Sequence, residues 1–247
     1  MIGKTIFDIL PRAIAVLGGT VRLGGVDLLA MRGGERRRLI ARTSAFIPQD
    51  PLTAFNPVRR VEGQMTDRLT AVLKLSRAEA RERARKLLEE VHIADPDRVL
   101  ASYPHQLSGG MRQRVLIASA FAAEPKLIVA DEPTTALDVT VQKQILRLIA
   151  EMQARPGTAL LFVTHDLGVV AKICQKITVL FGGSVVEDTD TASLFRAPAH
   201  PYSAALLAAT PRYDRPETSL LPVPAEVIEA TWREIAAVDA RWVEARQ

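Results

Sequence analysis

The sequence predicts an α/β fold in which helices cover a mostly parallel sheet. Two observations lead to this class. From residue 127 onward, short apolar runs alternate with helical segments, a pattern typical of parallel strands joined by crossover helices. The apolar runs at 127–130 and 160–164 contain no polar alternation, as expected for strands that are buried on both faces.

The elements before residue 108 follow from turn and capping signals. Residues 18–29 alternate around Gly-Gly pairs and predict a short antiparallel hairpin, and residues 44–47 predict a strand. The prolines in and before 49–57 make that segment a loop. The segment 62–93 is helical in pattern, and Ser76 with Glu79 forms a capping box that starts a helix, which Asp95-Pro96 is expected to end. Its inward side chains are Ala80, Ala84, Leu87, Leu88 and Val91.

The elements after residue 108 complete the alternation. A helix begins at about Ser108, and its inward side chains are Met111, Val115, Ala118 and Ala122. Asp138 caps a helix that runs to about Gln153. A further helix at 167–174 leads to a third strand at 177–180, and Gly182-Gly183 turns the chain into residues 184–187.

The C-terminal part is predicted to be helical. Short helices separated by prolines follow residue 191, residues 212–224 form a linker, and residues 225–247 form an amphipathic helix. Its apolar stripe is expected to pack against the body of the protein or against a partner, and consists of Ile228, Trp232, Ile235, Val238 and Trp242.

Size and composition limit the function classes. A chain of 247 residues corresponds to one domain, or to one domain with a tail. It contains no apolar stretch long enough to cross a bilayer, no secretory signal, and a single cysteine, Cys174, so a cytoplasmic protein is expected. The net charge is +4, but the basic residues are spread among 28 acids, and nucleic acid is not the expected partner.

Two adjacent acids, Asp131 and Glu132, follow the apolar run 127–130 and precede Pro133. Paired acids are normally a solvated surface feature, but a buried strand that ends in two carboxylates is typical of a nucleotide hydrolase. There the first acid, Asp131, holds Mg²⁺ through water, and the second, Glu132, is the general base for the attacking water.

A second segment opens a helix with Ser108, Gly109 and Gly110. Its backbone N–H groups and the positive end of the helix dipole can face a phosphate. The alternative is an ordinary glycine turn before a helix, but the flanking residues 103–106 and 112–114 argue against it.

Taken in this order, the two segments resemble the ATP-binding subunit of an ABC transporter, with Leu107 to Arg114 as the signature motif. The resemblance implies a P-loop-NTPase-like nucleotide-binding domain with a mostly parallel sheet, a helical subdomain and a C-terminal helical tail. It also implies that Ser108, Gly109 and Gly110 contact the γ-phosphate bound by a second ATPase subunit, so that the function requires a homo- or heterodimer.

The same resemblance assigns three further site residues. Gln49 looks like the Q-loop glutamine, which senses Mg²⁺ and the attacking water. His165 follows a predicted parallel strand, where α/β sites assemble, and looks like the switch histidine that contacts the γ-phosphate. Asp138, at the end of Ala136-Leu137-Asp138, looks like part of the D-loop, which touches the opposite nucleotide site.

Five segments resemble the oligopeptide and dipeptide importer branch: residues 49–57, 103–114, 131–139, 164–170 and 200–207. The resemblance covers about residues 18–211. It implies ATP and Mg²⁺ as cofactors, integral membrane permeases as partners, an extracytoplasmic solute-binding protein as an indirect partner, and a peripheral place on the cytoplasmic face of the inner membrane. No cysteine follows Cys174, so the iron–sulfur cluster that some relatives carry in their tail is not expected.

The main departure from the family lies at the start of the chain. The run Gly3-Lys4-Thr5 resembles the end of a P-loop, but the required glycine five residues before Gly3 is absent, and Lys4 is too close to Pro11 for the helix that relatives have there. We interpret this run as a chance match and expect Met1 to follow a P-loop that this chain lacks. The predicted segments are 1–48 for a partial core, 49–110 for Q-loop and helical subdomain, 111–190 for the rest of the core, and 191–247 for the tail.

Two alternatives remain open at the level of sequence. One is a soluble ABC ATPase that acts on nucleic acid or ribosomes, although such proteins usually carry two cassettes or large insertions. The other is a catalytically incompetent remnant that only binds partners. The sequence does not identify the imported solute.

Overall fold

The computed structural model describes residues 1–135, 139–154, 157–210 and 222–244. The chain divides into two compact units, Met1–Val163 and Thr164–Gln247. The four segments predicted from the sequence are defined by motifs and not by contacts, and they stay a prediction.

The core of the first unit is a three-stranded parallel sheet in the order β3-β4-β5. Its strands are β3 (Ser44–Ile47), β4 (Leu127–Asp131) and β5 (Ala159–Val163). The strands predicted at 44–47, 127–130 and 160–164 are therefore confirmed within one residue. The central strand β4 is the most buried, with Ile128, Val129 and Ala130 fully inaccessible to solvent. Asp131 therefore lies at the carboxyl end of the central strand.

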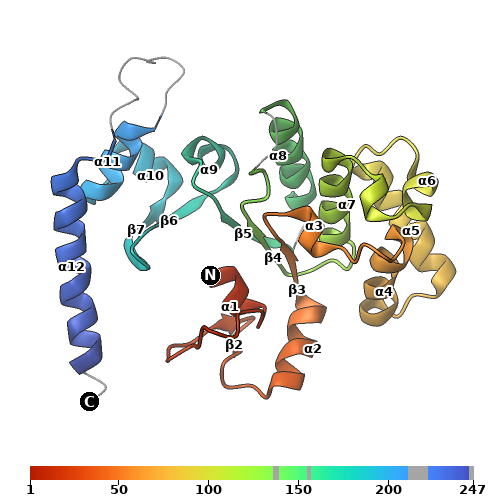
Figure 1. The fold of residues 1–247 in the computed structure, drawn as a ribbon, viewed down its shortest axis with the longest axis horizontal. Helices are drawn as coiled ribbons and strands as arrows, with labels where there is room; N and C mark the ends of the chain where they lie inside the picture. The colour runs from red at the N-terminus through yellow and green to blue at the C-terminus, as the bar shows by residue number, and fades with distance from the viewer. Residues whose placement is uncertain (136–138, 155–156, 211–221, 245–247) are drawn as a thin grey trace. The chain divides into compact units, whose positions relative to one another are not determined.

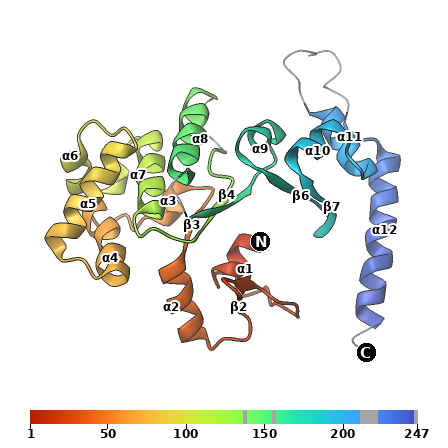
Figure 2. The ribbon, with the colours of Figure 1, turned by 180° about the vertical axis from the view of Figure 1, so that it is seen from behind.

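Helices α4 to α7 form a bundle at one side of this unit (Figures 1 and 2). The helix α5 begins at the predicted capping box, in which Ser76 Oγ accepts from Glu79 N and Glu79 accepts from Ser76 N. All five predicted inward side chains of this helix are buried. The bundle helices are α4 (Val61–Leu73), α5 (Arg77–Glu90), α6 (Pro96–Ala101) and α7 (Gly109–Phe121).

Two predictions in this region are wrong in detail. Within the segment 49–57, predicted to be a loop, the chain forms one helical turn, α3 (Pro51–Ala54), because Asp50 caps it by accepting from Leu52 N at 2.8 Å. The helix α5 ends at Glu90, and Asp95-Pro96 begins α6 instead of ending α5, since the Asp95 side chain accepts from Arg98 N. An acid followed by proline is a start signal for a helix as well as a stop signal.

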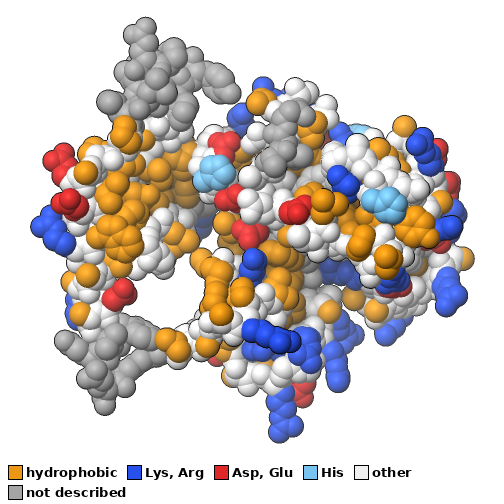
Figure 3. Space-filling view, in the orientation of Figure 1, with side chains coloured by type: hydrophobic (Ala, Val, Ile, Leu, Met, Phe, Trp, Pro, Cys, Tyr) orange, Lys and Arg blue, Asp and Glu red, His pale blue; other side chains and the backbone are white. Residues whose placement is uncertain are grey.

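The N-terminal part of this unit packs on the sheet. Helix α1 (Ile2–Ile6) places Gly3 against Val129 and Phe46, and the predicted hairpin is confirmed as β1 (Arg22–Leu23) paired antiparallel with β2 (Val26–Asp27). Helix α2 (Gly33–Thr43) then leads into β3. Lys and Arg side chains gather over α2 (Figure 3) and include the exposed Arg32, Arg37, Arg38 and Arg42. This helix is a local exception to the even mixing of charges.

The last helix of the first unit is α8 (Val139–Gln153), whose inner face buries Ile145, Leu148, Ile149 and Met152. The predicted cap of this helix, Asp138, lies outside the described residues, as does the part of the predicted linker (212–224) up to residue 221.

The second unit contains α9 (Leu167–Ile173) and a hairpin of β6 (Lys176–Phe181) and β7 (Ser184–Asp190). The strand predicted at 177–180 is present, but it pairs antiparallel with β7 and does not extend the parallel pattern. The reason is the two-residue turn: Gly182 and Gly183 have φ of 56° and 88°, which glycine adopts at little cost and which matches the twist of a tight hairpin.

Helices α10 (Thr191–Arg196), α11 (Pro201–Ala209) and α12 (Ala225–Glu244) complete this unit. The predicted packing of the α12 stripe holds only in part. Ile235 is buried, and Trp232 packs on Gly182 and on Phe181, with ring centroids 5.0 Å apart, but Trp232 and Val238 are 50% and 48% exposed. None of the helices in the described ranges is long and apolar enough to cross a membrane.

Candidate active site at the end of strand β4

The strand β4 delivers two adjacent carboxylates to its carboxyl end. Asp131 is the last strand residue and pairs with Val163 of β5, and Glu132 follows with its N–H donating to the Val163 carbonyl at 2.9 Å. Glu132 has φ of +49°, a left-handed conformation that non-glycine residues rarely adopt and that costs of order 1–3 kcal/mol. Such strain persists where surrounding contacts hold it, and it is common in active sites.

Two side chains from separate parts of the sequence hold the Glu132 carboxylate. Gln49 Nε2 donates to Glu132 Oε2 at 3.0 Å, and Thr135 Oγ1 donates to the same oxygen at 3.0 Å. Gln49 comes from the end of β3 and lies 83 residues away in the chain. The structure therefore brings together two of the predicted site residues, and it adds a third, Thr135, that the sequence analysis did not name.

The residues after Glu132 form a tight turn. Thr135 N donates to the Glu132 carbonyl at 3.2 Å, and Thr134 is only 7% exposed. The Pro133 carbonyl accepts a hydrogen bond from Gln113 Nε2 of α7 at 2.6 Å. The turn is thus attached to β5 through a backbone N–H and to α7 through a backbone carbonyl.

The predicted phosphate-contacting segment is the start of α7. Ser108 caps this helix by accepting from Met111 N at 3.3 Å, as the sequence predicts. A Cβ added at Gly109 would meet no atom within 4 Å, and one at Gly110 would meet only Val141 Cγ1 at 3.7 Å. Packing within the chain therefore does not require glycine at either position, whereas close approach by a ligand or another chain would.

The predicted phosphate-contacting histidine belongs to the second unit. His165 is exposed and stands between Thr164, whose Oγ1 accepts from Asp166 N, and Asp166, whose carboxylate caps α9 by accepting from Gly168 N at 2.8 Å. The role of His165 stays a prediction. Asp138, the predicted D-loop acid, lies outside the described residues, and its role also stays a prediction.

The donors at the end of β4 suit Mg²⁺. Asp131 is a half-buried carboxylate next to Glu132 and is supported by β5. Mg²⁺ in nucleotide hydrolases is usually held by one or two carboxylates, water and the phosphates of the substrate, not by an all-protein cage. The described residues contain no group of three or more His, Cys, Asp or Glu side chains that could hold a metal ion by themselves.

The run Gly3-Lys4-Thr5 does not form a phosphate-binding loop. It lies inside α1, where Thr5 N donates to the Met1 carbonyl at 3.0 Å. A Cβ at Gly3 would come within 3.0 Å of Val129 Cγ1, so glycine is required there for close packing on the sheet. The interpretation of this run as a chance match stays a prediction, and the packing of Gly3 on the sheet favours it.

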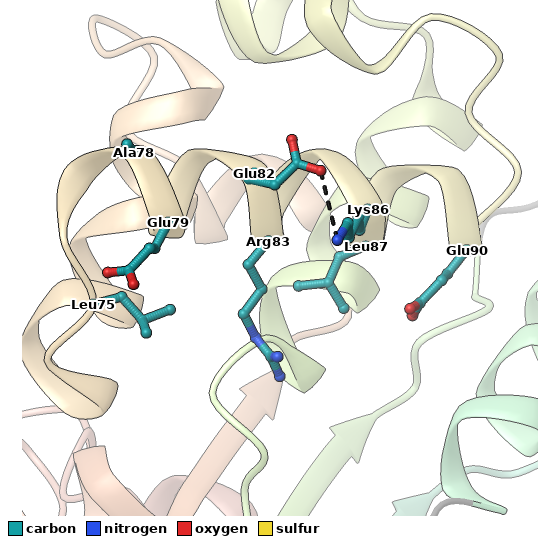
Figure 4. A pocket seen from close by; sticks show the side chains of 8 residues that line it. All are labelled: Leu75, Ala78, Glu79, Glu82, Arg83, Lys86, Leu87 and Glu90. Carbon is teal, nitrogen blue, oxygen red and sulfur yellow. Dashed lines mark ion pairs between the residues drawn. The ribbon is translucent and has the colours of Figure 1, made fainter.

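A surface pocket of about 530 Å³ lies elsewhere, along α5 (Figure 4). Its walls include Leu75, Leu87 and an ion pair in which Lys86 Nζ is 3.7 Å from Glu82 Oε1. Two of its other charged side chains are held by residues outside the pocket: Arg83 Nη2 donates to Glu124 Oε1 at 2.7 Å, and Glu79 accepts from Ser76 N. We therefore place the site by the chemistry at the end of β4 and not by the size of this hollow.

Two residues of this site were missed at the level of sequence, and each left a weak signal. Thr135 follows the acid pair by three residues, within hydrogen-bonding reach of Glu132 in a tight turn. Gln113 is a polar residue within a helix whose neighbours Val115 and Leu116 are buried. Neither signal indicates which group the side chain contacts, because the fold determines both hydrogen-bond partners.

Comparisons with known proteins agree with this geometry. The sequence profile described as ABC transporter matches residues 2–135. A probable peptide ABC transporter ATP-binding protein of Sinorhizobium fredii is 47% identical over 219 residues, which cover 88% of this chain and 65% of that protein. The dipeptide transport ATP-binding protein DppD of Escherichia coli is 44% identical over 212 residues, covering 86% of this chain and 65% of that protein.

Solved structures support the same relationship. A dimeric ATP-binding cassette in a post-hydrolysis state with ADP and phosphate is 26% identical, with a TM-score of 0.65 over 76% of this chain and 80% of that one. The chain spans about 65% of the length of the curated relatives that it matches. Because the profile covers more than half of the chain and includes the strand, the acid pair and the glycine-led helix described above, the chain belongs to the ABC transporter family.

Proposed function

We propose that the chain is the ATP-binding and ATP-hydrolysing subunit of an ABC importer for peptides. The observation that carries this proposal is the Glu132 carboxylate, which Gln49 and Thr135 hold at the end of the central strand. In this role Glu132 accepts a proton from the attacking water, Asp131 holds Mg²⁺ with the phosphates of ATP, and Gln49 senses both. The names of the relatives support peptides as the solute class over nucleic acid.

The proposal includes partners. Ser108, Gly109 and Gly110 contact the nucleotide that is bound by a second ATPase subunit. The absence of close contacts around both glycines within this chain fits that role. His165 and Asp138 complete the two sites. Integral membrane permeases carry the solute, an extracytoplasmic solute-binding protein delivers it, and the ATPase is peripheral on the cytoplasmic face of the inner membrane.

The first test addresses the chemistry through Thr135. It uses the transporter assembled with its partner subunits, in which residues 1–247 are preceded by a strand and a P-loop. Thr135→Val keeps the shape of the side chain but removes the donor to Glu132 Oε2, and hydrogen bonds to charged groups contribute about 1.5–3 kcal/mol. Because Gln49 still holds the carboxylate, we expect kcat to fall about tenfold at saturating ATP. Thr135→Ser keeps the hydroxyl and should retain most of the rate. Equal rates for the two variants would show that the Thr135 hydroxyl has no role in hydrolysis.

The second test addresses the permease surface, which we assign to residues 49–57 and the helices up to Ile93. Leu52 of α3 and Val58 beyond it are 52% and 80% exposed, as expected for side chains that a partner covers. With Cys174→Ala as background, Leu52→Cys is expected to cross-link to an integral membrane protein when native membranes are treated with a photoactivatable thiol reagent. Arg233→Cys on α12 is the matched exposed control. Cross-links from Arg233→Cys alone would contradict the assignment.

A further inference from the structure

The signature helix α7 and the turn that carries Glu132 are joined by one buried side chain. Gln113 is 1% exposed, and its Nε2 donates to the Pro133 carbonyl at 2.6 Å across 20 residues of sequence. Leaving a buried amide without a partner is costly, so this bond is a strong constraint on both of the groups that it joins.

The position of Pro133 makes this bond relevant to chemistry. Pro133 directly follows Glu132, whose left-handed backbone conformation must be held by its surroundings. The Glu132 N–H is fixed by the Val163 carbonyl and the Glu132 side chain by Gln49 and Thr135. The Gln113 bond fixes the peptide group between Pro133 and Thr134, one residue beyond Glu132, and so attaches α7 to this turn.

The position of Gln113 on α7 gives the bond a second role. Gln113 lies three and four residues after Gly110 and Gly109, so it is on the same face of the helix, one turn below the glycines. A shift of the helix start on meeting a phosphate therefore moves Gln113, and with it the Pro133 carbonyl. Buried, well-packed contacts of this kind transmit small displacements because the interior is close-packed.

We propose that Gln113 is a positioning residue for ATP hydrolysis, which holds the Glu132 turn in its reactive geometry and links that turn to the glycine-led start of α7. The proposal rests on the function proposed above. It assigns Gln113 no contact with nucleotide. Its effect is on the rate of the chemical step and not on the affinity for ATP.

The test measures ATP hydrolysis by the assembled transporter, with residues 1–247 preceded by a strand and a P-loop. It uses Gln113→Met, which keeps the length of the side chain and removes the donor. A small misplacement of a reacting group can cost up to 10²-fold, so we expect kcat to fall about 10- to 100-fold while KM for ATP changes less than about twofold. Gln144→Met is the matched control. Gln144, in α8, accepts from Arg114 of α7 at 2.8 Å and does not touch the turn. It should hydrolyse ATP at the wild-type rate.

Two further variants separate positioning from folding. A glutamate at this site can donate to the Pro133 carbonyl only when protonated, and burial raises the pKa of a carboxyl group. The rate of Gln113→Glu relative to wild type should therefore rise as pH falls, even if Gln113→Met folds poorly. In a Glu132→Gln background, Gln113→Met should cause no further loss of rate, because the group that it positions is already gone.

The outcomes distinguish the two proposals. If the wild-type transporter does not hydrolyse ATP, the proposed function fails. If Glu132→Gln hydrolyses ATP as fast as wild type, Glu132 is not the base, and the positioning role of Gln113 fails with it. If Glu132→Gln is inactive but Gln113→Met keeps the wild-type kcat, or raises KM alone, only the role of Gln113 is overturned. A Gln113→Glu rate ratio that does not change with pH also counts against the positioning role.

Discussion

In a transporter whose ATPase subunit has residues 1–247 preceded by a strand and a P-loop, Glu132→Gln is expected to keep ATP binding. It should reduce ATP hydrolysis about 10²–10⁴-fold, the usual cost of losing a general base. Glutamine has the shape of glutamate and can still contact Gln49 and Thr135, which lie 3.0 Å from Glu132 Oε2. It has no carboxylate to accept the proton of the attacking water. The variant should therefore accumulate with ATP bound and remain as a dimer of ATPase subunits.

The measurement is steady-state phosphate release, together with size-exclusion chromatography in the presence of Mg²⁺ and ATP. The matched control is Glu151→Gln, an exposed residue of α8 that lies outside the site. It should leave both results unchanged. Near-normal turnover by Glu132→Gln would mean that a different group accepts the proton.

A polypeptide made of residues 1–247 alone is expected to hydrolyse ATP no faster than background. In phosphoryl transfer nearly all catalysis is positioning and charge stabilisation, for which P-loop enzymes use a glycine-rich backbone cradle and its lysine. These 247 residues contain no G-x-x-x-x-G-K-[ST] run, and Lys4 belongs to α1, whose Gly3 packs on the sheet. The carboxylates at the end of β4 would then have no phosphate anchor beside them.

Isothermal calorimetry with Mg²⁺ and ATP tests this expectation, by comparison with the same residues preceded by a strand and a P-loop. Micromolar binding is expected only for the longer protein, and Lys4→Ala should not affect it. If the shorter polypeptide binds ATP with micromolar affinity and Lys4→Ala abolishes the binding, then Gly3-Lys4-Thr5 is a phosphate site after all.

Local signals were sufficient for much of the fold. The strand β3 occupies the predicted residues, because the run Ser44–Ile47 is apolar and Pro48 cannot continue the ladder. Helix α5 begins at its capping box, and α7 begins at Ser108, because each cap is a contact between residues three positions apart. Such contacts depend on neighbours in the sequence and can be inferred without the rest of the protein.

Local signals were insufficient where the burial or the structural role of a residue depends on what packs beside it. The stripe on α12 is apolar, but among its side chains that the structure describes only Ile235 is buried, while Trp232 packs on the Gly182 turn and remains half exposed. Asp95-Pro96 is compatible with the end of one helix and the start of the next, and the packing of α6 against α4 and α5 decides for the start. Periodicity identifies a helix face but not the surface that covers it.

By itself, the sequence determined the α/β class, the family, and the candidate site residues Gln49, Ser108, Asp131 and Glu132, because each lies in a short motif with a local physical meaning. Only the tertiary structure decided how the carboxylate is held. Gln49 reaches Glu132 across 83 residues and Gln113 reaches Pro133 across 20, and both bonds exist because parallel strands bring their carboxyl ends to one edge of the sheet, against which α7 packs. Hydrogen bonds between distant residues depend on the complete fold, and no local pattern encodes them.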